Sequence, residues 1–358
     1  MIKKIALVLG AAGLAAVGIA ASASASVKVE NAKCDVGVLL PDSKSSVRWE
    51  TQDRPDLQAA LKAQGLKACI TNAQGVAQTQ RTQADQAMTN GAKVLLLVNL
   101  DSGSGAAIAN AAKAKGVKTI DYDRLTLKGS SSYYVSFNNV SVGKLQGQGL
   151  VKCLTAAGKI GSGKAPVVAE LHGSPTDNNA TLFRQGYESV LNPLYANGTL
   201  TKGPQQAVPA WDNQKALTIF EGMLQQTANK IDGVDAANDG LGNAVVSALK
   251  ARGLAKIPVT GQDATAQGVQ NILTGDQCMT VYKAIKKEAA AAAVLAKSLI
   301  KKTKPAGVNG KVNDGRRNVP SVLLTPVAIT KANYKILFTD GFLKRADVCK
   351  GAVASLCT

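Results

Sequence analysis

Short apolar runs and longer amphipathic stretches alternate along the chain from Val36 onward. Val94–Asn99 is a continuous apolar run, which is typical of a strand buried on both faces of a parallel sheet. Gly103–Lys115 is rich in Ala and is followed by Gly116, a pattern that favours a helix ending there. The pattern of the first half predicts strands at Val36–Leu40, Leu66–Thr71, Val94–Asn99, Thr119–Tyr122 and Tyr133–Phe137, and helices at Asp53–Gln64, Val76–Asn90 and Gly103–Lys115. Alternation of this kind predicts one parallel, doubly wound lobe.

The same pattern restarts after Phe137. It predicts helices at Val142–Ala156, Asn179–Leu191, Asn213–Ala228, Gly242–Arg252 and Ala266–Thr274, and strands at Val167–Leu171, Gln205–Val208, Gly233–Ala237, Val259–Gly261 and Cys278–Val281. The chain then continues with a long Ala/Lys helix, Lys286–Lys301, a polar loop, Thr303–Asn318, and a last strand, Val322–Leu324. We therefore expect an α/β protein of two doubly wound, Rossmann-like parallel-sheet lobes. Two similar lobes favour a ligand site in the cleft between them.

The first 25 residues have the features of a signal peptide. Lys3 and Lys4 supply the positive start, Ile5–Ala20 is an apolar stretch, and the small residues after it offer cleavage after Ala23 or Ala25. A membrane anchor is the alternative, but the apolar run is short and rich in Ala and Gly. No Cys stands at the cleavage region, so a lipoprotein anchor is not indicated. We expect an exported chain that is periplasmic or extracellular, associated with the cell envelope, and soluble after cleavage.

The cysteine content agrees with export. The chain has six Cys, an even number, which makes disulfides plausible in an oxidising compartment. Sequence does not determine their connectivity, and free buried thiols are the alternative. The candidate pairs are Cys34 with Cys69, Cys349 with Cys357, and Cys153 with Cys278. Without a C-x-x-C pair and with one His in the chain, we expect no metal site.

The chain is strongly basic, with a formal net charge of +18. A nucleic-acid partner is the first interpretation of such a charge, but no aromatic residues interleave with the basic ones. The Lys residues are instead scattered over helices, as at Lys286, Lys287, Lys297, Lys301, Lys302 and Lys304. We therefore expect a solvated basic surface, which favours residence near an anionic cell envelope, and no nucleic-acid partner.

A burst of polar residues follows almost every predicted strand. The sequence LHGSPTDNNATLFR begins at the end of an apolar run and opens a helix, which places Asp177, Asn179 and Arg184 near the carboxyl end of a strand. Similar loops contain PDSKSSVRWE, DYDRL, AWDN, NDG, GQDA and VYK. Carboxylate, amide and guanidinium groups satisfy both the donors and the acceptors of sugar hydroxyls. The only two Trp, Trp49 and Trp211, stand in these loops, where an aromatic plane suits the apolar faces of a pyranose.

These residues carry a family resemblance that covers roughly Val36 to Lys344. The segments SVRWETQDR, IDYDRL, YVSFNNVSVGKLQ, GSPTDNNATLFR, NDGLGNA, GQDA, MTVYK and VPSVLLTP stand in the order found in the periplasmic sugar-binding proteins of ABC importers, of the ribose/galactose/xylose type. The chain resembles that family, whose fold is the type I periplasmic binding protein. The six Cys, the basic balance and the terminus beyond Lys344 are not features of the family.

The resemblance implies a set of ligand-binding residues. Arg48 and Trp49 lie in the first loop of the amino-terminal lobe, and Asp123 with Arg124 matches the Asp-Arg pair that grips ring and hydroxyl oxygens. The implied set is completed by Asp177, Asn179, Arg184, Trp211 as the stacking aromatic, Asn238, Asp263 and Lys283. The implied ligand is a monosaccharide, D-xylose or a related aldose such as glucose, ribose or galactose. The implied partner is the permease of an ABC transporter, to which a monomeric binding protein delivers the sugar.

The resemblance also implies a three-segment hinge, near Asn138–Asn139, Lys283–Ala284 and Thr325–Pro326. The expected boundaries are residues 1–25 for the signal peptide, 31–138 with 284–324 for the amino-terminal lobe, and 139–283 with 325–358 for the carboxy-terminal lobe. Ligand would stabilise a closed arrangement that the transporter recognises.

Two other classes of function compete with this hypothesis. A glycosidase would use Asp123 and Asp177 as paired carboxylates, but each has an Arg nearby in sequence that favours the ionised form, whereas a general acid needs a raised pKa. A transcription factor of the lac-repressor type shares the fold, but the export signal and the absence of an amino-terminal helix-turn-helix argue against it. His172, the lone His, is expected beside the site without a catalytic role.

Overall fold

The computed structural model describes residues 33–357. The predicted signal peptide, residues 1–25, lies outside this described part. Of the helices in residues 33–357, none is both long and apolar enough to cross a membrane.

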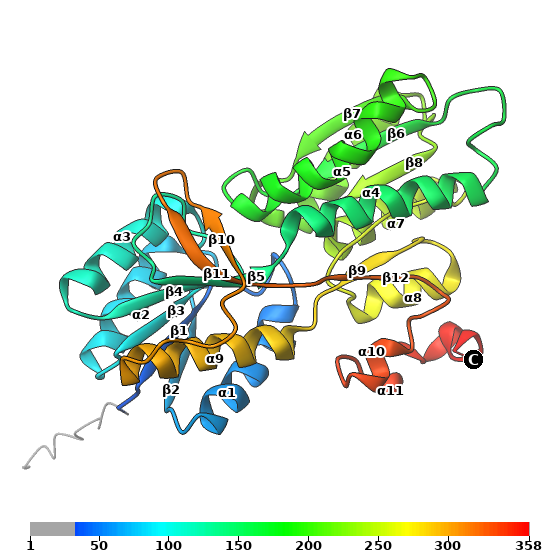
Figure 1. The fold of residues 1–358 in the computed structure, drawn as a ribbon. Helices are drawn as coiled ribbons and strands as arrows, with labels where there is room; N and C mark the ends of the chain where they lie inside the picture. The colour runs from blue at the N-terminus through cyan, green and yellow to red at the C-terminus, as the bar shows by residue number, and fades with distance from the viewer. Residues whose placement is uncertain (1–32, 358) are drawn as a thin grey trace, which may run out of the picture. The chain divides into compact units, whose positions relative to one another are not determined.

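A seven-stranded sheet organises the first lobe (Figure 1). Its strand order is β10-β11-β5-β4-β3-β1-β2. The bounds are β1 Val36–Leu40, β2 Ala68–Asn72, β3 Val94–Leu97, β4 Lys118–Tyr122, β5 Tyr133–Phe137, β10 Gly310–Asn313 and β11 Asn318–Leu324. All neighbouring strands are parallel except β10 and β11. Every residue of β3 is buried, as its continuous apolar run predicts for a sheet covered on both faces.

Helices cover both faces of this sheet (Figure 1). On one face, α1 (Arg54–Ala63) and α9 (Ile285–Lys301) contribute Leu57, Leu61 and the Ala side chains of α9 to an apolar core. On the other, α2 (Ala77–Thr89) and α3 (Ser102–Ala114) pack against the alternate side chains of β1 and β3. The long Ala/Lys helix therefore completes the first lobe, although it follows the second lobe in sequence.

One prediction in this lobe is wrong. The segment Thr303–Asn318 is not a continuous loop, because Gly310–Asn313 forms β10, which pairs with β11 in an antiparallel hairpin. The turn between them contains Asp314 and Gly315, with Gly315 at φ +86°, so the hairpin has a recognisable turn signal. Its polar composition concealed the strand, since β10 is an edge strand with no fully buried residue.

The second lobe is built on β6 (Val167–His172), flanked by β7 (Thr201–Ala207) and β8 (Gly233–Ala236) in parallel. The surrounding helices are α4 Asn139–Ala156, α5 Asn178–Ala196, α6 Asn213–Gln226, α7 Asp239–Ala251 and α8 Ala266–Thr274. Helices α4 and α5 approach each other very closely at Gly143. A Cβ added there would lie 1.9 Å from the carbonyl oxygen of Phe183. Glycine is therefore required where these helices cross.

The far edge of this second sheet differs from the prediction. Val259–Gly261 is not a full strand, since it contributes only an isolated parallel bridge between Val259 and Val234. The next strand, β9, covers Thr280–Tyr282 and pairs antiparallel with β12 (Val327–Ile329), which was not predicted. Backbone hydrogen bonds from Val281 to Gly261 and from Asp263 to Val281 nevertheless continue the sheet. The short helices η1 Trp49–Asp53, η2 Pro209–Trp211, α10 Ile336–Thr339, α11 Arg345–Val348 and η3 Gly351–Leu356 were also not predicted.

The chain passes between the two sheets three times, each time through one or two residues. Asn138 connects β5 to α4, residues 283–284 connect β9 to α9, and residues 325–326 connect β11 to β12. These are the three connections expected for the hinge, and they explain why each lobe is assembled from separate segments. The exact lobe boundaries stay a prediction.

Three disulfides join the pairs that the sequence offered as candidates: Cys34–Cys69, Cys153–Cys278 and Cys349–Cys357. The first disulfide joins Cys34, just before β1, to Cys69 in β2. The second joins Cys153 in α4 to Cys278, just before β9. No Cys in the described part of the chain is free, so the alternative of buried thiols does not hold there.

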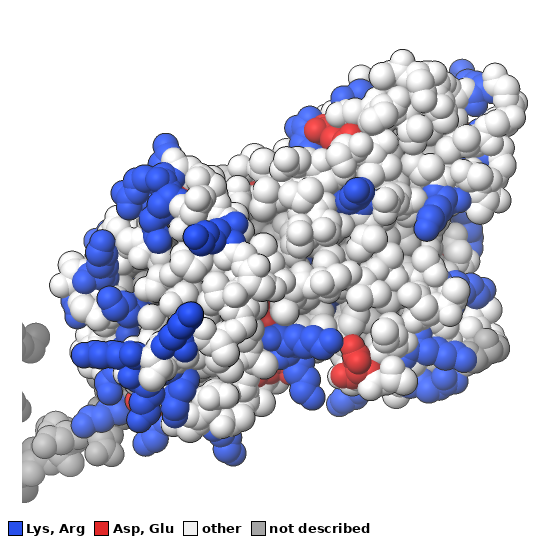
Figure 2. Space-filling view, in the orientation of Figure 1, with Lys and Arg blue, Asp and Glu red and all other residues white. Residues whose placement is uncertain are grey.

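The basic residues are spread over the surface of both lobes. Figure 2 shows Lys and Arg densely arranged over the first lobe, around the β10–β11 hairpin and α3, with little Asp or Glu on the same face.

Candidate functional site

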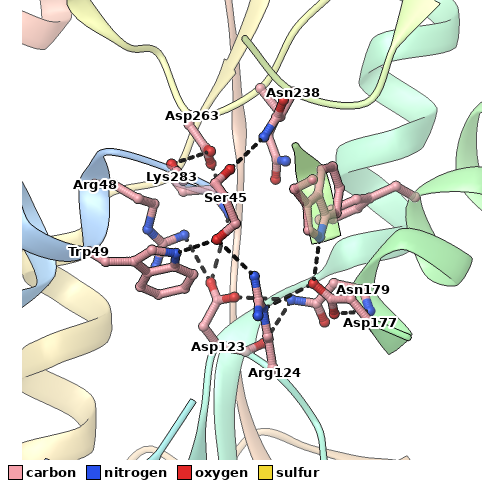
Figure 3. A pocket seen from close by; sticks show the side chains of 14 residues that line it. Ser45, Arg48, Trp49, Asp123, Arg124, Asp177, Asn179, Asn238, Asp263 and Lys283 are labelled. Atoms are coloured by element: carbon pink, nitrogen blue, oxygen red, sulfur yellow. Dashed lines mark hydrogen bonds and ion pairs between the residues drawn. The ribbon is translucent and has the colours of Figure 1, made fainter. Parts of the chain in front are cut away.

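A polar cavity lies where the loops of the two lobes meet (Figure 3). In this structure its cavity volume is about 30 Å³, far below the roughly 300–1,000 Å³ of small-molecule pockets, so the side chains of the two lobes nearly fill it. Ten predicted residues line it: Arg48, Trp49, Asp123, Arg124, Asp177, Asn179, Trp211, Asn238, Asp263 and Lys283. Four further residues line it that were not predicted: Ser45, Ser46, Phe183 and Gln262.

The first loop is folded by its own polar side chains. The Asp42 carboxylate accepts hydrogen bonds from the backbone N–H groups of Lys44 and Ser45, and from the Ser45 hydroxyl at 2.9 Å. The Ser45 hydroxyl in turn accepts the Trp49 indole N–H at 3.0 Å. Trp49 is thereby fixed at the start of η1, with the Arg48 guanidinium 4.3 Å above its ring, a cation–π distance.

Arg48 is the centre of a buried ion-pair network. Its guanidinium lies 2.8 Å from Asp53, 2.9 Å from Asp123 and 3.4 Å from Glu288 on α9. Burial alone would raise the pKa of Asp123, but Arg48, Lys283 and Arg124 together lower it to about 2. Burial raises the pKa of Glu288 well above its ordinary value, and neighbouring Asp123 raises it further. The Asp123 side chain at the cavity is therefore a firmly ionised acceptor, with Glu288 behind it on the far side of Arg48.

The backbone at Asp123 is held in an unusual conformation. Asp123 has φ +62°, in the left-handed region, directly after β4. Its carbonyl oxygen accepts hydrogen bonds from the hydroxyls of Tyr134 and Ser136, and from the side-chain amide of Asn179 in the second lobe. The same Asn179 amide also donates to the Asp123 carboxylate at 3.1 Å. A strained backbone held by this many partners is typical of a functional site.

Asp177 connects the second lobe to the first. One oxygen accepts the backbone N–H of Asn179 at the start of α5, which fixes the carboxylate as the helix N-cap. The other oxygen accepts the Trp211 indole N–H at 3.1 Å and lies 3.0 Å from the Arg124 guanidinium of the first lobe. Figure 3 shows Asp177, Asn179 and Arg124 meeting beside Asp123.

Trp211 depends on a glycine for its position. A Cβ on Gly173 would lie 2.1 Å from the indole ring, so only Gly permits the ring to lie on this backbone. Trp211 and Ala210 have φ values of +56° and +58°, a turn that aims the indole at the cavity. Phe183 packs edge-on to the indole, with ring centroids 6.3 Å apart.

The third group of contacts comes from the far loops of the second lobe. Lys283 lies at the crossing between lobes, with its ammonium 3.2 Å from Asp263 and 3.7 Å from Asp123. Asp263 accepts the Ser46 hydroxyl at 2.8 Å, and the Asn238 amide donates to the Ser45 carbonyl at 3.2 Å. These contacts join loops that are remote in sequence and hold the cavity nearly closed.

A buried carboxylate behind these loops supports them. Asp239 accepts hydrogen bonds from the backbone and hydroxyl of Thr265, from Gln277 and from Thr280. Burial raises the pKa of Asp239 to about 7, against the lowering effect of these hydrogen bonds. Asp239 therefore holds the turn at Asp263, whose φ of +91° is far from the ordinary range.

Three buried polar atoms at the cavity have no hydrogen-bond partner within the protein. They are Arg124 Nε, Gln262 Oε1 and Asp263 Oδ1. Arg124 Nε and Asp263 Oδ1 take part in ion pairs without hydrogen-bond geometry. Because buried polar groups are almost always paired, Gln262 Oε1, which has no ion pair either, indicates a ligand that donates a hydrogen bond.

Arg184 is the predicted site residue that the structure does not bring to the cavity. It directly follows Phe183 and lies on the exposed face of α5, with a side chain 46% exposed, and it pairs with Glu188 at 2.8 Å. His172 also lies outside the lining, in contact with the Tyr187 hydroxyl through Nδ1. Burial lowers the pKa of His172 to about 4, so it is a neutral, packed imidazole.

The four residues not predicted divide into two kinds. Ser45, Ser46 and Gln262 stand in the polar loops PDSKSSVRWE and GQDA, so the sequence signal marks their loops but not the individual residues. Phe183 stands on the first turns of α5, where an apolar residue is ordinarily assigned to the core. It is indeed part of the core as well as of the cavity wall.

Comparison with known proteins agrees with this architecture. The periplasmic binding protein domain family matches residues 36–304. A D-xylose-binding periplasmic protein of Haemophilus influenzae is 34% identical over 315 residues, covering 87% of this chain and 91% of that protein. A multiple sugar-binding periplasmic receptor of Rhizobium radiobacter is 33% identical over 334 residues, covering 89% of this chain and 93% of the receptor.

Solved structures give the same result. A carbohydrate transporter solute-binding protein from Chloroflexus aurantiacus, crystallised with D-glucose, superposes with a TM-score of 0.79 at 30% identity, covering 88% of this chain and 98% of that one. The chain belongs to the periplasmic binding protein family, with the type I fold. Its relatives are solute-binding proteins of ABC transporters that bind sugars, and not enzymes.

The geometry agrees with a binding protein. A glycosidase needs one carboxyl that stays protonated as a general acid, whereas ion pairs lower the pKa of Asp123 to about 2 against the effect of burial. One Asp177 oxygen accepts the Trp211 indole N–H and lies 3.0 Å from the Arg124 guanidinium. The carboxylates serve as fixed hydrogen-bond acceptors.

Proposed function

We propose that this chain captures an aldose in the cavity between its lobes, D-xylose first among the candidates, and delivers it to an ABC transporter. The balance of charge in the cavity lining carries the proposal. Three cations, Arg48, Arg124 and Lys283, are matched there by three carboxylates, Asp123, Asp177 and Asp263. A lining that neutralises its own charges suits an uncharged ligand with many hydroxyls, since a net charge on the ligand would have no partner.

The remaining features support a sugar in particular. Carboxylate, amide and guanidinium groups satisfy donors and acceptors of neighbouring hydroxyls, and the indoles of Trp49 and Trp211 offer apolar planes. Each hydrogen bond to a charged group contributes about 1.5–3 kcal/mol. A few such bonds, less the free energy of closing the lobes, give a dissociation constant on the order of micromolar.

D-xylose is favoured over other aldoses by the relative of Haemophilus influenzae, which is named for that sugar. D-glucose is the second candidate, since it is bound in the Chloroflexus aurantiacus structure. A single hydroxymethyl group separates the two sugars. We further propose that Arg184 is not a ligand contact, and that the chain acts as an exported monomer.

Calorimetric titration of the mature chain against D-xylose, D-glucose, D-ribose and D-galactose tests the proposal. We expect micromolar binding of D-xylose, accompanied by a change in Trp fluorescence. If D-glucose bound more tightly than D-xylose, D-glucose would be the proposed ligand instead. Absence of both heat and fluorescence change with every sugar would overturn the proposed function.

A further inference from the structure

A second pocket lies in the first lobe, away from the sugar cavity. Its walls are the end of α3, the start of β4, the loop before β5 and the turn of the β10–β11 hairpin. It shares no residue with the sugar cavity. Thr119 lines it near the start of β4, whereas Asp123 follows the end of the same strand, so about 13 Å of strand separates the two sites.

The charge of this pocket is unbalanced. Four cationic side chains line it, and no carboxylate does: Lys113, Lys118, Arg316 and Arg317. They come from two segments distant in sequence, 113–118 and 316–317, and the first lobe is densely basic around α3 and the β10–β11 hairpin (Figure 2). With a cavity volume of about 340 Å³, the pocket is large enough to hold a small ligand.

The nearest carboxylates are already occupied. Asp121 accepts hydrogen bonds from the Thr126 backbone and from the hydroxyls of Thr126 and Ser131. Asp314 accepts the backbone N–H groups of Arg316 and Arg317, and lies 3.7 Å from the Arg317 guanidinium. Arg317 is therefore partly paired and also donates to the Ser131 carbonyl. Lys113 and Lys118 are both exposed at the rim, and no carboxylate among the lining residues faces them.

Buried hydroxyls in the same pocket have no partner. Thr119 is 3% exposed, and its hydroxyl makes no hydrogen bond within the protein. The Ser130 hydroxyl is also buried and unpartnered. A buried hydroxyl without a partner is uncommon in a folded protein, and two of them beside four cations indicate a ligand that accepts hydrogen bonds.

We propose that this pocket binds an oxyanion of the phosphate class. Such a group accepts hydrogen bonds from hydroxyls and pairs with Lys and Arg, whose guanidinium fork matches two of its oxygens. Two sources share this chemistry: free inorganic phosphate and the headgroup of an anionic phospholipid at the cell envelope. The pocket and the sugar cavity have separate linings, so the chain carries two sites: one lined by balanced charges and one whose charged lining residues are all cations.

The first arm of the test uses inorganic phosphate. The mature chain, in a phosphate-free buffer of low ionic strength, is titrated with phosphate and followed by calorimetry and by the backbone amide shifts of Thr119 and Ser130. We expect saturable binding in the millimolar range or tighter, with shifts at these amides. No saturable binding, or shifts confined to other regions, would overturn the proposal.

Matched variants separate this pocket from the general basic charge. The double variant Lys113→Gln/Lys118→Gln removes two lining cations, while Lys93→Gln/Lys115→Gln removes two cations of the same lobe outside the pocket. We expect the first to weaken phosphate binding at least fivefold and the second less than twofold. Thr119→Val, which keeps the shape of the side chain, is expected to weaken it as well. If both double variants weakened phosphate binding equally, the binding would depend only on the net charge of the lobe, and the proposed site would be rejected.

The second arm identifies the source. Vesicles of phosphatidylglycerol and of phosphatidylcholine are sedimented with each variant. Selective loss of phosphatidylglycerol binding in Lys113→Gln/Lys118→Gln, reversed by competing phosphate, would assign the site to a lipid headgroup. Equal vesicle binding by both double variants would assign it to free phosphate, provided that the first arm is positive. D-xylose binding measured on the same samples is expected to be unchanged, so failure of this site is distinguishable from failure of the sugar assignment.

Discussion

The sugar cavity and the basic pocket of the first lobe are built from the same kinds of side chain and have opposite character. In the cavity, three cations face three carboxylates, and hydrogen bonds cross from one lobe to the other. In the basic pocket, four cations line a surface without a carboxylate, and all of its walls belong to one lobe. The difference lies in the pairing of the charges rather than in their number.

This comparison shows how a strongly basic protein can hold an uncharged ligand. A charge that is buried and paired acts as an oriented hydrogen-bonding group, whereas an unpaired one at a surface attracts counterions. The net charge of +18 therefore says little about the main site. It describes the outer surface, where the basic pocket lies.

The largest effect is expected from removing one carboxylate of the sugar cavity, which leaves its cations in excess. Asp123→Asn keeps the size of the side chain and tolerates the left-handed backbone, but removes the partner of Arg48 and Lys283. We expect sugar affinity to fall at least 100-fold, about 3 kcal/mol, as measured by calorimetry. We expect the free energy of unfolding to fall by up to about 3 kcal/mol, since a buried pair is broken.

Phosphate binding by Asp123→Asn serves as the control, and it should stay within a factor of about two of the wild type because the two sites share no residue. Sugar affinity close to that of the wild type would mean that Asp123 has only a structural role.

Removing the indole of the second lobe tests the apolar wall of the cavity. Trp211→Ala loses both the ring and the N–H bond to Asp177. We expect sugar affinity to fall by about 30-fold, on the order of 2 kcal/mol. Trp211→Phe keeps an aromatic plane without the donor, and an intermediate loss is expected. Urea unfolding of both variants controls for the core contacts of Trp211, and an affinity loss fully explained by unfolding would contradict the role.

Salt distinguishes the two sites in a single sample. Exposed charges are screened at high ionic strength, where the Debye length falls to about 3 Å at 1 M. We expect phosphate affinity to fall at least about fivefold between 20 mM and 300 mM sodium chloride, because Lys113 and Lys118 are exposed. Sugar affinity is expected to stay unchanged. A sugar site that weakens in parallel with the phosphate site would show that its charges are not internally matched.

The pH dependence of sugar binding is expected to be small. The ion pairs lower the pKa of Asp123 to about 2, below the value of about 3.9 expected for the unfolded chain. Its contribution to stability is therefore complete above about pH 3.9 and is lost only as the pH falls toward 2. Calorimetry from pH 8 to pH 5 should give sugar affinities within about a factor of two. A titration step in this range other than that of Asp239, whose pKa burial raises to about 7, would indicate that Asp123 is not the ionised acceptor.

The smallest effect is expected at Arg184. Its side chain is 46% exposed and pairs with Glu188 on the same helix. Arg184→Ala should leave sugar affinity within about a factor of two, since an exposed pair of this kind contributes roughly 0.5 kcal/mol or less. Arg184→Lys, which keeps the charge, is the matched comparison. A tenfold loss of affinity in Arg184→Ala alone would return Arg184 to the binding site.

The helices and strands could be predicted from the sequence where the pattern of apolar residues is regular. Helix α8 matches its predicted bounds, and β1 and β5 do as well. Prediction failed where the local pattern was weak: β10 is a polar edge strand, and β12 is a three-residue strand whose existence depends on pairing with β9. Such elements are specified by partners remote in sequence, which a local pattern does not contain.

The site followed the same rule. The polar loops after strands identified Asp123, Asp177 and Asp263, because the ends of parallel strands gather at one edge of a sheet. Arg184 was assigned with its neighbours, but a helix turns about 100° per residue. That rotation places Phe183 at the cavity and Arg184 at the surface. The basic pocket was not foreseen, since its residues come from segments that only the completed sheet brings together.

The position of β11 in the first sheet has a consequence for the biogenesis of the protein. β11 lies between β5 and β10, so Ser321 pairs with Tyr134 across the whole length of the second lobe. A ribosome must therefore finish the second lobe before the first can close its sheet. Contacts of such long sequence separation form slowly, and we expect the nascent first lobe to stay open until its last two strands arrive.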